Sequence, residues 1–372
     1  MPPISLLIKP ASSNCNLHCK YCFYNSVAQN RMTESYGIMS RETLEILVKK
    51  ALAYAEDYCI FAFQGGEPTV TGIDFYRSLI NFVKLYNYKH LKIDYSIQTN
   101  GLLINEEWAR LFKENNFLVG ISLDGPKDIH DMMRVDINGK GSFTRVIRTI
   151  ELFNKFKVDY NILCVVNNIV ARHINQVYTF FKKNNFQYLQ FIPCLDPLGE
   201  EPEGYEFSLT AERYTYFLKN LFDLWYEDII NGKLISIRYF DNLVGLAMGK
   251  PPESCGMTGV CTPYFVIESN GGVYPCDFYV IDEWFMGNIH DQSFEGLYNC
   301  KSVTQFAEVS RYVDPECKEC YWYGLCRGGC RRDREPFADS RPVLNRFCAS
   351  YKEFFEYATE RIIKLARMLQ KR

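Results

Sequence analysis

Three cysteines close to the N-terminus have the spacing of a metal-cluster loop. Residues 15–22 read Cys-Asn-Leu-His-Cys-Lys-Tyr-Cys, a C-x3-C-x2-C run formed by Cys15, Cys19 and Cys22. A four-iron cluster needs four ligands, so three thiolates leave one iron open to a small molecule. An open coordination position also distinguishes a catalytic metal site from a structural one. The pattern predicts a catalytic iron–sulfur cluster, with a zinc knuckle or three unrelated buried thiols as alternatives.

A second set of eight cysteines lies beyond residue 250 and suffices for two four-cysteine sites. Part of this set reads C-x2-C-x5-C-x3-C and is followed by a more distant cysteine. Zinc ribbons also use paired C-x2-C motifs, so the spacing alone leaves zinc and iron–sulfur clusters both open. The eight are Cys255, Cys261, Cys276, Cys317, Cys320, Cys326, Cys330 and Cys348.

The composition is that of an ordinary globular protein. The 372 residues are 47% hydrophobic and 23% charged, and the net charge of −2 comes without a long Lys/Arg block, which argues against nucleic-acid and membrane partners. The N-terminus lacks the features of a signal peptide, and no apolar run approaches the ~18 residues of a transmembrane helix. Fifteen cysteines without an export signal indicate metal or redox work in a reducing compartment, by default the cytoplasm. Of the four cysteines outside the two sets, Cys59, Cys164 and Cys194 are expected to be buried small hydrophobes, and Cys300 is left over.

Six short apolar runs alternate with stretches of helical periodicity in the first half of the chain. Ser40 is a predicted helix N-cap, followed by Leu44, Leu47 and Val48 on one helical face. Strands that alternate with helices predict βαβ units and a parallel sheet. Because six repeats are too few for a closed eightfold barrel, we expect an open partial (β/α)6 barrel. The runs are residues 4–8, 59–63, 93–97, 118–123, 160–166 and 188–192.

Polar or Gly/Pro-rich segments follow all six runs. In barrels of parallel strands the active site forms at the carboxyl ends of the strands, so these segments are predicted to gather at one rim. Each could instead be only a strand terminator. The segments are the cysteine loop and residues 64–68, 98–101, 124–126, 167–168 and 193–197.

From about residue 235 the chain becomes cysteine-rich and turn-rich. A helix over residues 211–230 is expected to close the first domain, and residues 264–268 and 273–280 predict a β-hairpin. The expected domains are residues 1–234 for the barrel, 235–350 for the cysteine-rich domain and 351–372 for a C-terminal helix. That helix is predicted to pack through a face formed by Phe355, Ala358, Ile362, Leu365 and Leu369.

The cysteine loop, with Tyr21 directly before its last cysteine, resembles the defining motif of the radical S-adenosylmethionine (SAM) enzymes. The later cysteines resemble the SPASM auxiliary-cluster domain. The Gln-Gly-Gly-Glu-Pro-Thr, Gln-Thr-Asn-Gly and Tyr-Pro-Cys-Asp-Phe-Tyr segments make the chain most similar to the anaerobic sulfatase-maturating enzymes, from the first strand to the last of the eight cysteines. The resemblance implies SAM and three [4Fe–4S] clusters as cofactors. It implies that one auxiliary cluster is held by Cys255, Cys261, Cys276 and Cys330, and the other by Cys317, Cys320, Cys326 and Cys348.

The resemblance also assigns the SAM contacts. Gly66 would meet the amino group of SAM, and Ser122 and Arg134 its carboxylate, which the fork of a guanidinium group matches. Tyr21 and Leu195 would flank the adenosine, largely through backbone contacts. Taken alone, a Gly-Gly pair is more often a turn, and a single arginine more often belongs to a solvated ion pair.

Asp277 directly follows the cluster ligand Cys276 and is the general base that the resemblance implies. A carboxyl group next to an anionic cluster and away from water should have a raised pKa, which suits a base. The alternative is a carboxylate that accepts backbone hydrogen bonds around the cluster loop. Gln64 and Tyr24 would contact the substrate residue.

The implied reaction converts a cysteine or serine side chain of a sulfatase to Cα-formylglycine without oxygen. A 5′-deoxyadenosyl radical abstracts a Cβ hydrogen, Asp277 removes the side-chain proton, and a second electron leaves, by way of an auxiliary cluster. The implied partners are an unfolded or nascent sulfatase with a Cys/Ser-x-Pro-x-Arg motif and a one-electron donor such as flavodoxin or ferredoxin.

Two other functions compete with this one. A maturase that forms thioether or carbon crosslinks in ribosomal peptides would use the same domains, but many of these carry an N-terminal leader-binding domain. The first predicted strand starts near Ile4, only eleven residues before Cys15, which leaves no room for such a domain. A non-catalytic iron–sulfur or zinc scaffold would have no use for a three-cysteine site, and zinc without iron would support it.

Overall fold

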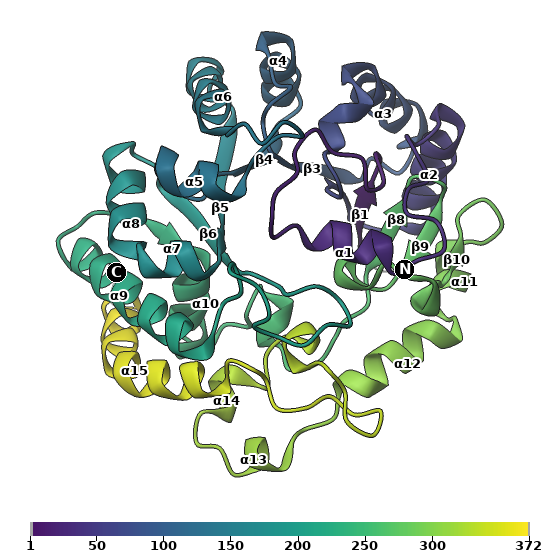
Figure 1. The fold of residues 1–372 in the computed structure, drawn as a ribbon. Helices are drawn as coiled ribbons and strands as arrows, with labels where there is room; N and C mark the ends of the chain where they lie inside the picture. Colours follow the sequence, from purple (N-terminus) through teal and green to yellow (C-terminus); the bar gives the residue numbers. More distant parts are fainter. Residues whose placement is uncertain (1–2, 371–372) are drawn as a thin grey trace. The chain divides into compact units, whose positions relative to one another are not determined.

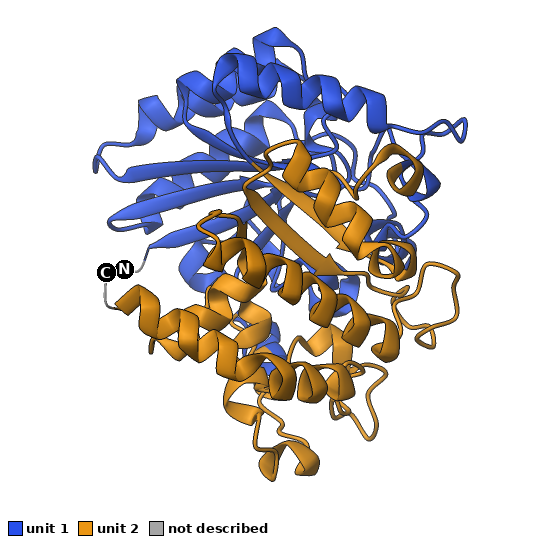
Figure 2. Cartoon of the chain, turned by 90° about the vertical axis from the view of Figure 1, so that its left-hand side faces the viewer, with its two compact units in different colours: residues 1–122, 131–160, 263–306 blue, residues 123–130, 161–262, 307–372 orange. Residues whose placement is uncertain are grey.

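The computed structural model describes residues 3–370 and divides into two compact units (Figure 2). Unit 1 comprises residues 1–122, 131–160 and 263–306, and unit 2 comprises residues 123–130, 161–262 and 307–372. The first two residues of the expected barrel domain and the last two of the expected C-terminal helix lie outside the described residues. The expected boundaries at residues 234/235 and 350/351 stay a prediction.

The strands of unit 1 follow the order β10-β9-β8-β1-β2-β3-β4. Strands β1 to β4 are parallel neighbours, with Leu6 of β1 paired with Phe61 of β2. Both side chains are fully buried, which is why these strands read as apolar runs in the sequence. The bounds are β1 Ile4–Lys9, β2 Tyr58–Phe63, β3 Lys92–Thr99, β4 Phe117–Ser122, β8 Phe265–Glu268, β9 Gly272–Tyr274 and β10 Gly287–Asn288.

Helices follow the parallel strands as predicted. Helix α2, Arg41–Tyr54, begins at the predicted N-cap, where Ser40 Oγ accepts a 3.0 Å hydrogen bond from the backbone N–H of Thr43. Its buried face includes the predicted Leu44 and Leu47. The other helices of unit 1 are α1 Phe23–Gln29, α3 Ile73–Tyr86, α4 Glu106–Glu114, α6 Phe143–Phe156 and α11 Phe294–Tyr298, while α5 Lys127–Met133 and α12 Lys301–Ser310 contain boundaries between the units.

The predicted hairpin is present and is joined to the first strand of the chain (Figure 1). Strand β8 pairs in parallel with β1, so that Glu268 lies beside Lys9, and in antiparallel fashion with β9. The expected second hairpin strand, residues 273–280, is too long, because β9 ends at Tyr274. Pro275 follows and has no backbone N–H to give to a ladder. Asp277 therefore begins a short 3₁₀ helix, Asp277–Tyr279, and does not lie on a strand.

In unit 2 the strands follow the order β5-β6-β7, all parallel. Strands β5 Asp159–Val166 and β6 Tyr188–Pro193 are the last two predicted runs, and β7 is the pair Ser236–Ile237. The helices are α7 Asn168–Arg172, α8 Ile174–Lys183, α9 Ala211–Ile230, α10 Arg238–Ala247, α13 Pro315–Lys318, α14 Tyr323–Cys326 and α15 Cys348–Gln370.

The C-terminal helix α15 starts at Cys348, three residues before the expected start. It runs parallel to α9, since Ser350 Oγ bonds to the carbonyl of Ala211 and Arg361 pairs with Asp223 further along. Four of the five residues of the predicted face are buried, but Leu369 is 50% exposed because it lies beyond the end of α9. No helix within residues 3–370 is long and apolar enough to cross a membrane.

Candidate active site

The cysteine loop follows β1 and is closed by its own backbone. The N–H of Cys22 donates to the carbonyl of Cys19 at 3.1 Å. Two further backbone bonds, from His18 to the carbonyl of residue 135 and from Lys20 to the carbonyl of residue 133, tie the loop to the segment around Arg134. The Arg134 guanidinium lies 5.5 Å from the centroid of the Tyr21 ring. Four residues predicted from the sequence, Cys19, Tyr21, Cys22 and Arg134, therefore lie together in unit 1.

Gly66 is in contact with the backbone of the cysteine loop. A Cβ atom added at this position would lie 2.1 Å from the carbonyl oxygen of Asn14, so only glycine fits. The N–H of Gly66 donates to the carbonyl of Ser12 at 2.9 Å, and the N–H of Glu67 to that of Asn14 at 2.8 Å. These bonds hold the loop after β2 against the cysteine loop.

The carboxylate of Glu67 is buried and connects three loops. It accepts hydrogen bonds from Thr99 Oγ1 at 2.7 Å and from the backbone N–H of Asn100 at 2.7 Å. Asn100 Nδ2 in turn donates to Asn16 Oδ1 at 2.7 Å and lies 3.8 Å from Cys15 Sγ. Burial raises the pKa of Glu67, and these hydrogen bonds oppose the shift. The Gln-Gly-Gly-Glu and Gln-Thr-Asn-Gly segments thus support Cys15, the first cysteine of the loop.

Ser122 ends β4 and is held by a side chain from the neighbouring strand. Gln98 Nε2 donates to Ser122 Oγ at 3.1 Å. The space for this amide exists because residue 120 is glycine, where an added Cβ would lie 2.0 Å from Gln98 Oε1. Ser122 is 8% exposed, so its hydroxyl has a defined orientation at the end of the strand.

Asp277 is buried and hydrogen-bonded through one oxygen only. Tyr24 Oη donates to Asp277 Oδ2 at 2.5 Å, and Gln64 Nε2 lies 3.4 Å from the same oxygen. The backbone N–H of Asp277 donates to Tyr264 Oη at 3.2 Å. Asp277 Oδ1 has no hydrogen-bond partner among the residues that the structure describes. The three residues assigned to base and substrate contact are therefore neighbours, and one carboxylate oxygen is left for a further donor.

Two basic side chains, Lys9 and Arg31, lie next to the acidic side chains of this site. Lys9 Nζ lies 4.7 Å from the centroid of the Tyr24 ring and 3.9 Å from Glu268 Oε2. Glu268 Oε2 also accepts a 2.7 Å hydrogen bond from Arg31 Nη1. All three charged side chains are buried. Burial raises the pKa of Asp277, and the Lys9 charge and the Tyr24 hydrogen bond oppose the shift. Burial and the neighbouring Asp277 raise the pKa of Tyr24, so the phenol keeps its proton and acts as the donor.

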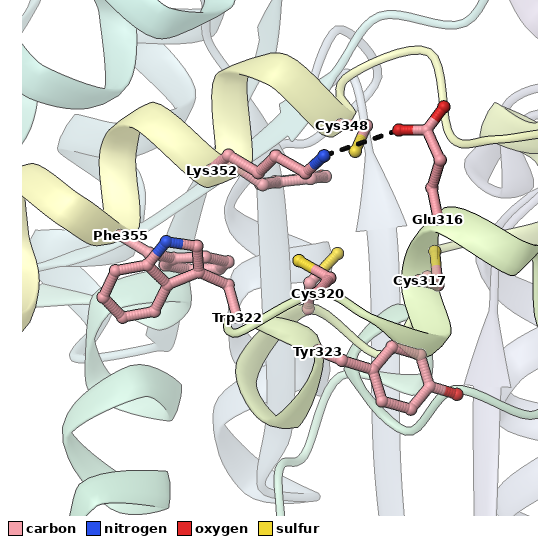
Figure 3. A pocket seen from close by; sticks show the side chains of 11 residues that line it. Glu316, Cys317, Cys320, Trp322, Tyr323, Cys348, Lys352 and Phe355 are labelled. Atoms are coloured by element: carbon pink, nitrogen blue, oxygen red, sulfur yellow. Dashed lines mark ion pairs between the residues drawn. The ribbon is translucent and has the colours of Figure 1, made fainter.

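Four of the late cysteines line one cavity in unit 2. Cys317, Cys320, Cys326 and Cys348 line this small cavity, with Trp322 and Phe355 on its wall. Figure 3 shows three of these thiols around the cavity and the Glu316–Lys352 ion pair, 3.6 Å long, beside Cys348. No three His, Cys, Asp or Glu side chains within residues 3–370 converge on a point that would hold a single metal ion.

The other late cysteines are divided between the units. Cys276 belongs to unit 1, whereas Cys255, Cys261 and Cys330 belong to unit 2. The N–H of Cys261 is held by Ser310 Oγ at 2.9 Å, and the N–H of Arg332 lies 3.4 Å from Cys330 Sγ. None of the fifteen cysteines, all within the described residues, forms a disulfide. The three expected to be small hydrophobes are buried: Cys59, Cys164 and Cys194.

Two protein-family models match parts of the chain. Residues 10–181 match the Radical SAM superfamily, and residues 255–321 match SPASM, an iron–sulfur cluster-binding domain. The chain is 54% identical, over its whole length and that of the relative, to the cysteine-type anaerobic sulfatase-maturating enzyme of Clostridium perfringens strain ATCC 13124. The chain belongs to the anaerobic sulfatase-maturating enzymes.

Two further relatives define its place in the family. This sulfatase-maturating enzyme is 34% identical to the serine-type enzyme of Bacteroides thetaiotaomicron, over 95% of this chain and 89% of that one. It superimposes on the solved structure of native anSMEcpe with bound AdoMet with a TM-score of 0.95, at 55% identity over 98% of this chain and 100% of that chain. The predicted fold class is confirmed: a radical SAM partial (β/α)6 barrel, a cysteine-rich SPASM region with a hairpin, and a C-terminal helix.

The donor sets of this sulfatase-maturating enzyme fit iron–sulfur clusters. In the C-x3-C-x2-C loop, Cys15 Sγ accepts hydrogen bonds from the Leu17 N–H at 3.4 Å and from Asn100 Nδ2 at 3.8 Å. Donors directed at sulfur are one of the means by which proteins stabilise and tune such clusters. The four-cysteine cavity offers an all-thiol set with largely apolar walls. Both observations suit thiolates that carry a multinuclear group.

Sequence reasoning assigned no role to Glu67, Gln98 or Lys9 of this enzyme. Glu67 and Gln98 lie in segments that are expected to form the rim, so their positions in the sequence already indicate a place near the site. Lys9 ends the first strand in an apolar context, and nothing local shows that its charge is buried. Leu195, the remaining predicted SAM contact, lies in unit 2 just beyond β6.

Proposed function

We propose that this enzyme oxidises a specific cysteine of a sulfatase to Cα-formylglycine without oxygen, with Asp277 as the base. The observation that carries the proposal is the buried Asp277 carboxylate, held at Oδ2 by Tyr24 while Oδ1 has no partner among the described residues. A cysteine substrate is favoured over serine by the 54% identity to a cysteine-type relative, against 34% to a serine-type one.

The residues proposed to hold the cofactors follow from the family and suit the geometry of each loop. Cys15, Cys19 and Cys22 would hold the first cluster, and the eight late cysteines would hold two auxiliary clusters in the sets assigned above. Together with SAM, these clusters supply the one-electron chemistry, namely hydrogen-atom abstraction at the substrate Cβ and removal of a second electron.

The chain itself binds and orients SAM. The Gly66 carbonyl accepts a hydrogen bond from the amino group, and the Arg134 fork together with Ser122 Oγ binds the carboxylate. Gln98 fixes the Ser122 hydroxyl through their 3.1 Å hydrogen bond. Tyr21 and Leu195 flank the adenosine through their backbones. When the guanidinium and hydroxyl groups already have fixed orientations, SAM binding costs less conformational entropy.

Asp277 performs the proton transfer at the substrate. Its free Oδ1 accepts the proton of the substrate thiol, while the Tyr24 hydrogen bond keeps Oδ2 in place. Gln64 and Tyr24, both next to the carboxylate, position the substrate side chain. In total the substrate cysteine would lose a hydrogen atom to the deoxyadenosyl group of SAM, a proton to Asp277 and an electron to an auxiliary cluster. Water would then add to the resulting thioaldehyde carbon, and hydrogen sulfide would leave to give the aldehyde.

The proposed partners follow from this chemistry. The substrate is an unfolded or nascent sulfatase segment with a Cys-x-Pro-x-Arg motif, and the electron donor is a small one-electron carrier such as flavodoxin or ferredoxin. Fifteen cysteines without a disulfide among them suit a reducing compartment, for which we propose the cytoplasm.

The test is an anaerobic incubation of the reconstituted enzyme, SAM and a reductant with a Cys-x-Pro-x-Arg peptide or its serine counterpart. Mass spectrometry should show conversion of the cysteine peptide to the aldehyde, at a higher rate than conversion of the serine peptide. An intramolecular crosslink would instead support a peptide-crosslinking maturase. Faster conversion of the serine peptide would overturn the cysteine-type assignment.

A further inference from the structure

Two arginines hold the backbone on both sides of Leu195. Arg346 Nη2 donates to the carbonyl of Cys194 at 2.8 Å, and Arg332 Nη2 donates to the carbonyl of Asp196 at 2.8 Å. All five residues belong to unit 2. The peptide groups that flank Leu195 are therefore both fixed by guanidinium groups that come from far along the chain.

The Asp196 side chain adds a charged anchor to the same loop. Its carboxylate forms an ion pair with Arg346 Nη1. It also accepts hydrogen bonds from Ser208 Oγ and from the backbone N–H of Glu203, the latter at 3.2 Å. Asp196 is 5% exposed and the Arg346 side chain 13% exposed. A nearly buried carboxylate–guanidinium pair is strongly directional, and removing one partner leaves the other charge without compensation.

Each arginine lies two residues from a proposed auxiliary-cluster ligand. Arg332 follows Cys330, and its own N–H lies 3.4 Å from Cys330 Sγ. Arg346 precedes Cys348, and its N–H donates to the carbonyl of Asp333 at 2.9 Å. The segment between Cys330 and Cys348 thus contacts the loop after β6 near both of its ends.

We propose that Arg332 and Arg346 are positioning residues that connect the auxiliary-cluster segment to the SAM-binding loop. They fix the backbone on either side of Leu195 from within the 330–348 segment. SAM affinity therefore depends on these two guanidinium groups, even where the rest of the segment is assembled. The inference rests on the proposed contact between Leu195 and the adenosine of SAM.

Arg334 provides a matched control in the same segment. It is also buried, at 5% exposed, and also donates to two backbone carbonyls, those of Tyr312 and Val343. Both partners belong to unit 2, and no hydrogen bond between Arg334 and the loop at residues 194–196 is found among the described residues. Arg334→Gln therefore loosens the segment by a similar loss of bonds but leaves the loop anchors in place.

The test compares Arg346→Gln, Arg332→Gln and Arg334→Gln as reconstituted holoenzymes. Iron content and thermal stability are measured first, and SAM affinity is then measured by equilibrium dialysis under anaerobic conditions. We expect SAM binding to weaken by about 10-fold or more in the first two variants at full iron content, as is typical when supporting hydrogen bonds of a bound group are lost. Arg334→Gln should bind SAM as the wild type does.

The outcomes separate this inference from the proposed function. Wild-type SAM affinity in both Arg332→Gln and Arg346→Gln would overturn the inference while leaving the function intact. Equal weakening in Arg334→Gln would also overturn it, because general loosening would then be the cause. Failure of the wild-type holoenzyme to bind SAM would contradict the proposed function itself. If Arg346→Gln loses iron, Arg332→Gln carries the test alone, since it leaves the Asp196–Arg346 pair in place.

Discussion

Tyr24 Oη and Asp277 Oδ2 form a 2.5 Å hydrogen bond between residues that are 253 positions apart in the sequence. Tyr24 belongs to the helix that follows the cysteine loop, and Asp277 begins the turn after the hairpin. In the sequence, Tyr24 thus follows the cysteines proposed to hold the SAM-cleaving cluster, and Asp277 follows a proposed auxiliary-cluster ligand. The bond determines which oxygen of the carboxylate remains free for the substrate.

Asp277→Asn separates SAM cleavage from substrate oxidation. The change keeps size and shape but removes proton-accepting capacity at Oδ1. Because the proposed SAM contacts lie elsewhere, 5′-deoxyadenosine should still form, while formylglycine should fall by ~10²–10⁴. Both products are measured in one anaerobic assay. Near-normal peptide oxidation by this variant would falsify the catalytic role.

Tyr24→Phe tests the positioning of the base. A hydrogen bond to a charged group contributes about 1.5–3 kcal/mol, so formylglycine formation should fall by roughly 10- to 100-fold while iron content is unchanged. Tyr264→Phe is the comparison, because Tyr264 Oη accepts a 3.2 Å hydrogen bond from the backbone N–H of Asp277. This change should reduce formylglycine formation less than Tyr24→Phe does. A larger loss in Tyr264→Phe than in Tyr24→Phe would show that the turn, and not the carboxylate, limits the reaction.

Gly66→Ala should disrupt the cysteine loop. The new methyl group would lie 2.1 Å from the carbonyl oxygen of Asn14, which cannot move without displacing the adjacent Cys15. We expect the protein to lose the iron of one cluster, about four of about twelve atoms, and to lose SAM cleavage. Gly245→Ala is the control, since its added Cβ would meet only Lys250, at 3.9 Å. Full iron content in Gly66→Ala would contradict the assigned contact.

Replacing Cys15, Cys19 and Cys22 together by alanine should remove one cluster and leave the other two. Iron should fall by about a third, from about twelve atoms per chain, because each [4Fe–4S] cluster holds four. SAM cleavage should be abolished. Survival of 5′-deoxyadenosine formation in this variant would show that the radical chemistry starts elsewhere.

Replacing Cys317 and Cys320 by alanine should damage folding as well as activity. The cavity that these cysteines line is bordered by α13, α14 and the start of α15, and the first two helices are only four residues long. Short helices have little packing of their own, so ligand binding there contributes folding free energy. Thermal unfolding of the reconstituted variant is the measurement. Native thermal stability without that cluster would count against the prediction.

The strands and the first helix cap could be predicted because their signals are local. Apolar runs of four to eight residues correspond to β1 through β6, and Ser40 caps α2 through a bond to a residue three positions away. The position of Asp277 was predicted less well. The hairpin strand was extended past Pro275, although a proline without an N–H was a sign that the ladder ends there.

The buried ionic contacts could not be predicted from the sequence. Lys9 pairs with Glu268, and Arg346 pairs with Asp196 150 positions away. Nothing near a lysine or an arginine in the sequence shows that its partner will arrive from another part of the chain. The contact between Gly66 and Asn14 is similar, because a Gly-Gly pair by itself indicates only a turn.

The pairing of β8 with β1 means that the barrel strands are not an independent module. Strand β8 occupies the edge of β1 from Leu6 to Lys9, and its residues lie beyond position 264. A chain cut before the hairpin would expose that edge, whose backbone groups can then pair with another molecule and promote aggregation. A C-terminal region that is exchanged between relatives must therefore include a strand that pairs with β1 as well as its cysteines. This holds for recombination and for engineering.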